Sequence, residues 1–157
     1  LNGGSAIRFL TIEMVGAAVG LLAVTASGAI ADRIGRRVLL GVSAAMIGAY
    51  SGFAPQLLDR GPAGEWTYMI LGFVLLGLSF GQSSGATNGS FSPRHRYTGA
   101  GTTATAAWFV GAAFAPLAAL FLASRFGLIA VGAYLLSGAA CTLGALALNR
   151  DWGRKAA

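Results

Sequence analysis

The chain has 157 residues, of which 55% are hydrophobic and 10% are charged, and its mean hydropathy is +0.69. About a quarter of the residues of a soluble domain are charged, so this composition excludes an ordinary soluble domain and indicates a membrane protein. The formal net charge of +6 does not indicate a nucleic-acid partner, because most basic residues lie in short clusters between apolar runs, as topology-setting charges do.

Five apolar stretches are long enough for helices that cross the hydrocarbon core, which takes about 20 residues. In chain order they are residues 9–31, 38–58, 66–92, 101–122 and 126–148. None shows the alternating ten-residue pattern of a membrane barrel strand. The sequence therefore predicts an all-α integral membrane protein with five transmembrane helices in one domain over residues 1–157.

The distribution of lysine and arginine predicts the orientation of these helices, because cytoplasmic loops carry the excess of positive charge. Eight basic residues fall on one predicted side: Arg33, Arg36, Arg37, Arg94, Arg96, Arg150, Arg154 and Lys155. Three fall on the other side: Arg8, Arg60 and Arg125. We therefore expect a multi-pass protein of the cell (inner or plasma) membrane with a cytoplasmic carboxy terminus. The amino terminus then lies outside, which is the arrangement expected of a chain that lacks earlier helices.

The first span contains Glu13, the only acidic residue inside a predicted span. It lies about 6 Å from the start of the span at 1.5 Å per residue. A carboxylate inside the membrane is a candidate for proton or substrate coupling. The alternative, which this shallow position favours, is a residue that stays hydrated near the outer surface.

Small residues recur at four-residue intervals in the first three spans, which places them along one side of each helix. The third span carries the longest series, and the others repeat it: Gly77, Gly81, Gly85 and Gly89, then Ala44, Gly48 and Gly52, then Gly16 and Gly20. Such stripes let neighbouring backbones approach closely in lipid. We predict close helix packing along them.

The end of the third span is polar, with Gln82, Ser83, Ser84, Thr87, Asn88 and Ser90. These groups would cost free energy against lipid, so they are expected to face protein or a water-filled cavity. A solvated cavity lining and interhelical hydrogen bonds both remain open. Together with Trp108 in the fourth span, Gln82 and Asn88 are the candidate cavity residues.

The first predicted cytoplasmic loop, residues 28–37, reads Gly-Ala-Ile-Ala-Asp-Arg-Ile-Gly-Arg-Arg. Gly28 would let its helix end approach another helix, and Gly35 would permit a tight turn. Asp32 could accept backbone hydrogen bonds at a helix amino end. The arginines could hold carboxylates or lipid phosphates.

This loop resembles the signature loop of the major facilitator superfamily, G-x-x-x-D-R-x-G-R-R, at every fixed position. The resemblance implies a twelve-helix transporter in which this chain supplies the last five helices, because four spans follow the loop. It also implies a conformational latch at the cytoplasmic face, formed by Gly28, Asp32, Arg33, Gly35, Arg36 and Arg37. The partner of the latch would lie in the missing amino-terminal half of the same transporter.

Residues 91–100, Phe-Ser-Pro-Arg-His-Arg-Tyr-Thr-Gly-Ala, resemble the F-P-x-x-x-R-Y-T-G-A/S stretch of metabolite–proton symporters, with Ser92 as an additional residue. That subgroup is similar to carriers of shikimate, 2-oxoglutarate, citrate, and proline or betaine. The resemblance implies proton-coupled transport of an organic acid or a zwitterion. Arg96, Tyr97, Thr98 and Gly99 would form a cytoplasmic gate or a headgroup anchor, and an anchor is the simpler interpretation.

The sequence does not predict an enzyme, a cofactor or a metal site. It offers one histidine in a loop, one cysteine in an apolar run and one acid in a span, without the spacing of metal ligands. The expected partners are a small-molecule substrate, protons, membrane lipid and the missing half. The alternative is a non-transporting multi-pass scaffold or a truncated gene product.

Overall fold

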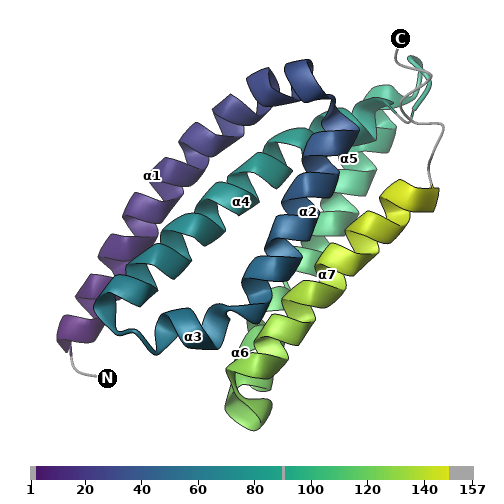
Figure 1. Ribbon diagram of the computed structural model, residues 1–157. Helices are drawn as coiled ribbons and strands as arrows, with labels where there is room; N and C mark the ends of the chain where they lie inside the picture. Colours follow the sequence, from purple (N-terminus) through teal and green to yellow (C-terminus); the bar gives the residue numbers. More distant parts are fainter. Residues whose placement is uncertain (1–2, 90, 149–157) are drawn as a thin grey trace.

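The computed structural model describes residues 3–89 and 91–148, and within this part every regular element is helical. The elements are α1 (Gly3–Ile34), α2 (Arg36–Gly52), α3 (Ala54–Leu58), α4 (Pro62–Gly89), α5 (Arg96–Ala107), the π-helical turn η1 (Trp108–Ala112), α6 (Ala115–Phe126) and α7 (Leu128–Leu148). The long helices run up and down beside one another, with α4 between α1 and α2 (Figure 1). The predicted all-α fold is confirmed.

Four helical stretches in the described part have the length and hydropathy to cross a membrane: Ile7–Ile34, Pro62–Ser83, Arg96–Phe126 and Leu128–Leu148. These stretches make the chain a multi-pass membrane protein. The turn between α1 and α2 and the start of α5 lie at one end of the bundle, whereas α3 and the turn between α6 and α7 lie at the other (Figure 1).

The uninterrupted helix predicted over residues 38–58 is divided in two. Helix α2 ends at Gly52, and the short α3 turns aside across the end of the bundle (Figure 1). Pro55 explains the break, because proline has no backbone N–H to donate to the carbonyl of residue 51 in a continuous helix. The 17 residues of α2 span about 26 Å, which is slightly less than the hydrocarbon core.

The fourth predicted span, residues 101–122, begins earlier and is not regular. Helix α5 starts at Arg96, gives way to η1 at Trp108, and continues as α6 to Phe126. In η1 the Ala113 N–H donates to the Trp108 carbonyl, five residues back, at 3.2 Å. Pro116 lies three residues further along, and it has no N–H to donate to the carbonyl of residue 112. One extra residue is thereby accommodated just before the proline.

The predicted small-residue packing is confirmed between α1 and α4. A Cβ atom added at Gly77 would lie 2.4 Å from the Gly20 carbonyl oxygen and 2.8 Å from the Ala23 Cβ. A Cβ added at Gly81 would lie 2.0 Å from the Ser27 hydroxyl oxygen. Any larger side chain at these glycines would push the two helices apart, so glycine sets their separation.

Close packing also joins α2 to α7. A Cβ at Gly48 would meet Leu136 at 3.3 Å and Ala139 at 3.6 Å, and one at Gly132 would lie 2.8 Å from the Ser51 carbonyl oxygen. Gly52 does not take part, because nothing lies within 4 Å of a Cβ added there. The predicted stripe on α2 was therefore right at Gly48 and wrong at Gly52, which is already at the end of the helix.

Candidate functional site

Gly35 makes the tight turn between α1 and α2, as predicted. Its φ of +88° lies in the region that side chains rarely adopt, and its ψ is 139°. The Gly35 N–H donates to the Ala31 carbonyl at 2.8 Å, and its own carbonyl accepts from the Leu39 N–H at 3.1 Å. The turn thus ends one helix and starts the next without a gap.

Two other predictions for this loop have no counterpart within the described residues. Asp32 lies in the last turn of α1, and no side chain caps the amino end of α2. The tight turn at Gly35 starts α2 directly, so Asp32 remains an exposed carboxylate beside the end of α1. Gly28 does not permit a close approach here, because nothing in the described chain lies within 4 Å of a Cβ added to it.

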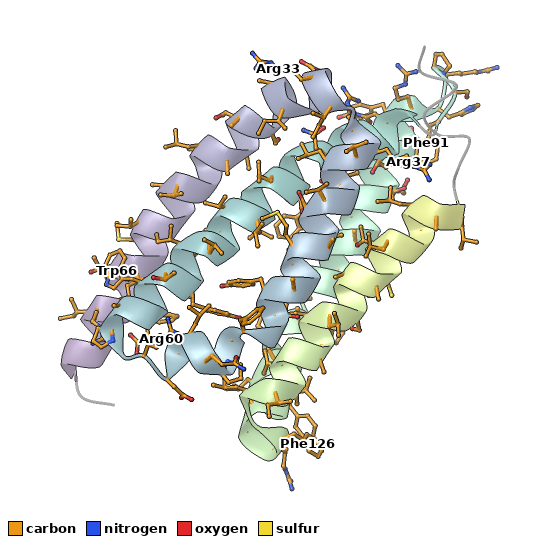
Figure 2. All side chains as sticks on the ribbon, in the orientation of Figure 1. Arg33, Arg37, Arg60, Trp66, Phe91 and Phe126 are labelled. Atoms are coloured by element: carbon orange, nitrogen blue, oxygen red, sulfur yellow. The ribbon has the colours of Figure 1, made fainter. Side chains whose placement is uncertain are left out.

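The arginines of the loop contact neighbouring helices. The Arg36 guanidinium lies against α4, where its Nη1 would be 2.7 Å from a Cβ at Gly85. The Arg37 guanidinium donates to the Leu146 carbonyl in the last turn of α7, where backbone carbonyls lack helical partners and favour a cation. Arg33 is exposed at the end of α1 (Figure 2). Two arginines therefore join helix ends, and Arg33 and Asp32 face outward.

The segment predicted to be a gate or anchor begins α5. Arg96, Tyr97 and Thr98 are exposed, and Tyr97 exposes 94% of its surface. The Phe91 ring covers Gly99, since a Cβ there would lie 2.5 Å from the ring. This segment therefore packs through Gly99 and leaves its polar and aromatic side chains exposed.

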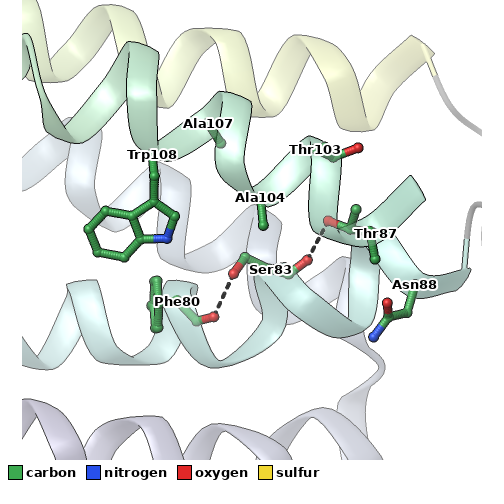
Figure 3. A pocket seen from close by; sticks show the side chains of 9 residues that line it. Phe80, Ser83, Thr87, Asn88, Thr103, Ala104, Ala107 and Trp108 are labelled. Carbon is green, nitrogen blue, oxygen red and sulfur yellow. Dashed lines mark hydrogen bonds between the residues drawn. The ribbon is translucent and has the colours of Figure 1, made fainter. Parts of the chain in front are cut away.

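An open groove of about 560 Å³ lies between α4 and the α5–η1 segment (Figure 3). The residues that line it are uncharged: Phe80, Ser83, Thr87, Asn88, Ala100, Thr103, Ala104, Ala107 and Trp108. Two predicted cavity residues, Asn88 and Trp108, thus line the same groove and lie near its opposite ends (Figure 3). The other groove residues on α5 were not predicted, although the small, hydroxyl-rich sequence from 100 to 107 could have indicated a helix that leaves space beside it.

The groove surface is mainly apolar, with an aromatic end and a few hydroxyl groups along the α4 side. Phe80 and Trp108 meet edge to face, with ring centroids 6.2 Å apart and planes at 80°. The Ser83 hydroxyl donates to the Phe80 carbonyl at 2.7 Å, and the Thr87 hydroxyl donates to the Ser83 carbonyl at 2.8 Å (Figure 3). Because these hydroxyl protons are used within α4, the hydroxyl oxygens present mainly acceptor lone pairs to the groove.

Gln82 has a different position from the one predicted. It is 3% exposed, and its Nε2 donates to the Ser27 hydroxyl of α1 at 3.0 Å. The Ser27 hydroxyl in turn donates to the Val24 carbonyl at 2.6 Å. Both alternatives for the polar end of this span therefore occur: Gln82 forms an interhelical hydrogen bond, while Ser83, Thr87 and Asn88 line the groove. Ser90 lies outside the described residues.

Glu13 lies apart from the groove. Its side chain is exposed in the first half of α1, far along the helix from the turn at Gly35. An ion pair between Arg8 and Glu65 joins α1 to the start of α4. The sequence did not reveal that pair, because the two residues are far apart in the chain and neither belongs to a motif.

The basic residues gather at two ends of the bundle. Arg33 and Arg37 lie at the same end as Phe91, and Arg60 lies at the other end with Trp66 and Phe126 (Figure 2). Arg150, Arg154 and Lys155, three of the eight residues on the predicted cytoplasmic side, lie outside the described residues.

Comparisons with known proteins identify metabolite transport proteins as relatives. The chain is 35% identical over 130 residues to the inner membrane metabolite transport protein YhjE of Escherichia coli, a match that covers 82% of this chain and 30% of that protein. A Haemophilus influenzae protein to which metabolite transport is ascribed is 29% identical over 150 residues, and the match covers 95% of this chain and 34% of that protein. A second such protein of Haemophilus influenzae is 30% identical over 142 residues, and the match covers 89% of this chain and 32% of that protein.

The chain spans about a third of the length of these curated relatives. No protein-family model and no solved structure matches it.

Proposed function

We propose that this chain is the carboxy-terminal part of a major facilitator transporter of the metabolite–proton symporter type. The whole transporter would move a small polar metabolite, an organic acid or a zwitterion, across the cytoplasmic membrane by alternating access. Its long helices α1, α2, α4 and α7, together with the span formed by α5, η1 and α6, would be the last five of twelve. The remaining helices of the same protein would complete the substrate path.

The groove between α4 and α5 is the observation that carries this proposal. It is large enough for a small metabolite, it holds polar and aromatic side chains together, and it lies in a chain whose relatives are named for metabolite transport. Polar groups on membrane helices are expected at substrate and ion pathways. We propose that Asn88 and Trp108 contact the solute.

The signature loop would act as the latch at the cytoplasmic face. Arg36 and Arg37 contact α4 and α7 within this chain, whereas Asp32 and Arg33 face outward and could contact the other half. We therefore propose a division of roles in which Asp32 and Arg33 form the contact between halves. The basic end of the bundle would then face the cytoplasm, with the Arg96–Gly99 segment at the headgroups.

Uptake by the full-length protein in sealed proteoliposomes tests the proposed function. An inward proton gradient is expected to drive accumulation of at least one radiolabelled solute among shikimate, 2-oxoglutarate, citrate, proline and betaine. A protonophore should abolish that accumulation, because the gradient supplies the free energy. Proton-independent uptake would contradict the proposed coupling, and failure to accumulate any of these solutes would contradict the proposed substrate class.

The same vesicles test the latch. Asp32→Asn is expected to slow uptake while leaving the thermal stability of the protein unchanged, because Asp32 is exposed and makes no cap within this chain. Asp59→Asn, an exposed aspartate at the end of α3, is the matched control and should transport normally. Equal uptake by the two variants would remove Asp32 from the latch.

A further inference from the structure

The groove between α4 and the α5–η1 segment offers a bound solute few hydrogen-bond donors. Each of the three hydroxyl groups that line it donates to a backbone carbonyl of its own helix, at 2.7 or 2.8 Å: Ser83, Thr87 and Thr103. A hydroxyl has a single proton, so none of the three has a proton left for a solute. The side-chain donors that remain among the lining residues are the Asn88 amide and the Trp108 indole N–H.

The groove also lacks a cation that could pair with a carboxylate. No charged residue lines it within the described part of the chain. Arg36 contacts Gly85, which points about 200° around α4 from Ser83, on the side away from the groove. Arg96 lies about 18 Å from Trp108 along the helix, too far away to form an ion pair there. A solute carboxylate in the groove would therefore lose its water without gaining a partner, which is costly.

Phe80 and Trp108 form an aromatic corner at one end of the groove (Figure 3). Their ring planes meet at 80°, with the centroids 6.2 Å apart. Phe80 is 51% exposed and Trp108 is 59% exposed, so ring surface remains free to contact a solute. Aromatic faces carry partial negative charge and attract cations, tryptophan most strongly. Because the rest of the groove is mainly apolar, a cation with apolar substituents fits it better than a strongly hydrated one.

We propose that the aromatic corner binds the ammonium group of a zwitterionic solute whose nitrogen carries apolar substituents. The hydroxyl oxygen of Ser83, nearly one turn of α4 from Phe80, presents acceptor lone pairs to the same cation. The solute carboxylate points away from this chain, toward the remaining helices of the transporter. This inference rests on the proposed transport function, and it selects the zwitterion over the organic acid as the solute.

Binding of matched probes to the full-length protein in lipid nanodiscs tests the ammonium site. Glycine betaine is paired with 3,3-dimethylbutanoate, and proline is paired with cyclopentanecarboxylate. Within each pair the shape and the carboxylate are kept, and a neutral carbon replaces the charged nitrogen. Calorimetric titration, with empty nanodiscs as the blank, is expected to show that one zwitterion or both bind at least about tenfold more tightly than the isostere.

Two results would overturn the proposal. In the first, neither zwitterion binds more tightly than its neutral-centred isostere. In the second, citrate or 2-oxoglutarate binds more tightly than both zwitterions, which would mean that the solute site selects negative charge.

Substitutions at the corner provide the second test, with the affinity ratio within a probe pair as the readout. Trp108→Leu removes a ring face, so the ratio should fall about tenfold, whereas Trp108→Phe should keep most of it. Phe109→Leu is the matched control, because Phe109 is exposed and does not line the groove. A loss of folded protein affects both members of a pair equally and leaves the ratio unchanged. A wild-type ratio in Trp108→Leu would exclude the corner as the ammonium site.

The ammonium site and the transport function can fail separately. Binding needs no proton gradient, so zwitterion binding without gradient-driven uptake would count against transport alone. Gradient-driven uptake of an organic acid, with no preference for the zwitterions in binding, would overturn the ammonium site and leave transport intact.

Discussion

Replacing Gly77 by alanine should destabilise the full-length protein by about 1–3 kcal/mol, the usual cost of overpacking a close interface. The added Cβ would lie 2.4 Å from the Gly20 carbonyl oxygen of α1, and a backbone atom cannot move aside as the end of a flexible side chain can. Helices α1 and α4 would have to separate. The free energy of unfolding in detergent micelles, measured by denaturant titration, reports this change.

Gly144→Ala is the matched control, because nothing lies within 4 Å of a Cβ added at Gly144 on α7. It should be neutral or slightly stabilising, since alanine has the higher helix propensity. Equal stability of the two variants would contradict the close α1–α4 packing described here.

Filling the groove should abolish transport without unfolding the protein. Ala104→Trp places an indole on the α5 wall, opposite Ser83 and Thr87, where the groove has a volume of about 560 Å³. We expect the uptake rate of the full-length protein to fall at least about tenfold, which corresponds to roughly 1.4 kcal/mol of lost transition-state stabilisation. The rate is measured in proteoliposomes and divided by the amount of reconstituted protein.

A tryptophan two residues away, at position 106, distinguishes a blocked groove from general damage to α5. Ala106 is exposed but does not line the groove, so Ala106→Trp should keep most of the uptake. If both variants transport normally, the solute does not pass through this groove. If both variants lose transport equally, the bulk of tryptophan on α5 is responsible, and the result would contradict a solute path through this groove.

The arrangement of the helices was largely predictable from short-range patterns. Apolar length indicated the four stretches that could cross a membrane but not the break in residues 38–58, and the four-residue spacing of Gly77 and Gly81 placed a close contact on one side of α4. The positive φ of Gly35 was likewise predictable, because a tight interhelical turn requires it. Each of these features depends on the local geometry of one helix or one turn, which sequence spacing encodes directly.

Features that depend on which helix lies opposite were not predictable. Gln82 and Ser83 are adjacent in sequence, yet Gln82 is buried against α1 and Ser83 lines the groove, because they point about 100° apart around α4. The partner of Arg37 is a backbone carbonyl of α7, which no sequence pattern marks. The π-helical turn Trp108–Ala112 interrupts the span before Pro116, and the apolar length of the span gives no sign of it.

The mass of the native protein tests most directly whether this chain works as part of a whole transporter. An antibody against residues 150–155 would detect the protein in its source membranes, and intact mass would be measured after mild extraction. We expect a single polypeptide two to three times the 15.9 kDa of this chain, in line with the length of its relatives. A native polypeptide of 15.9 kDa would contradict it, because the helices that complete the transport path would then be absent.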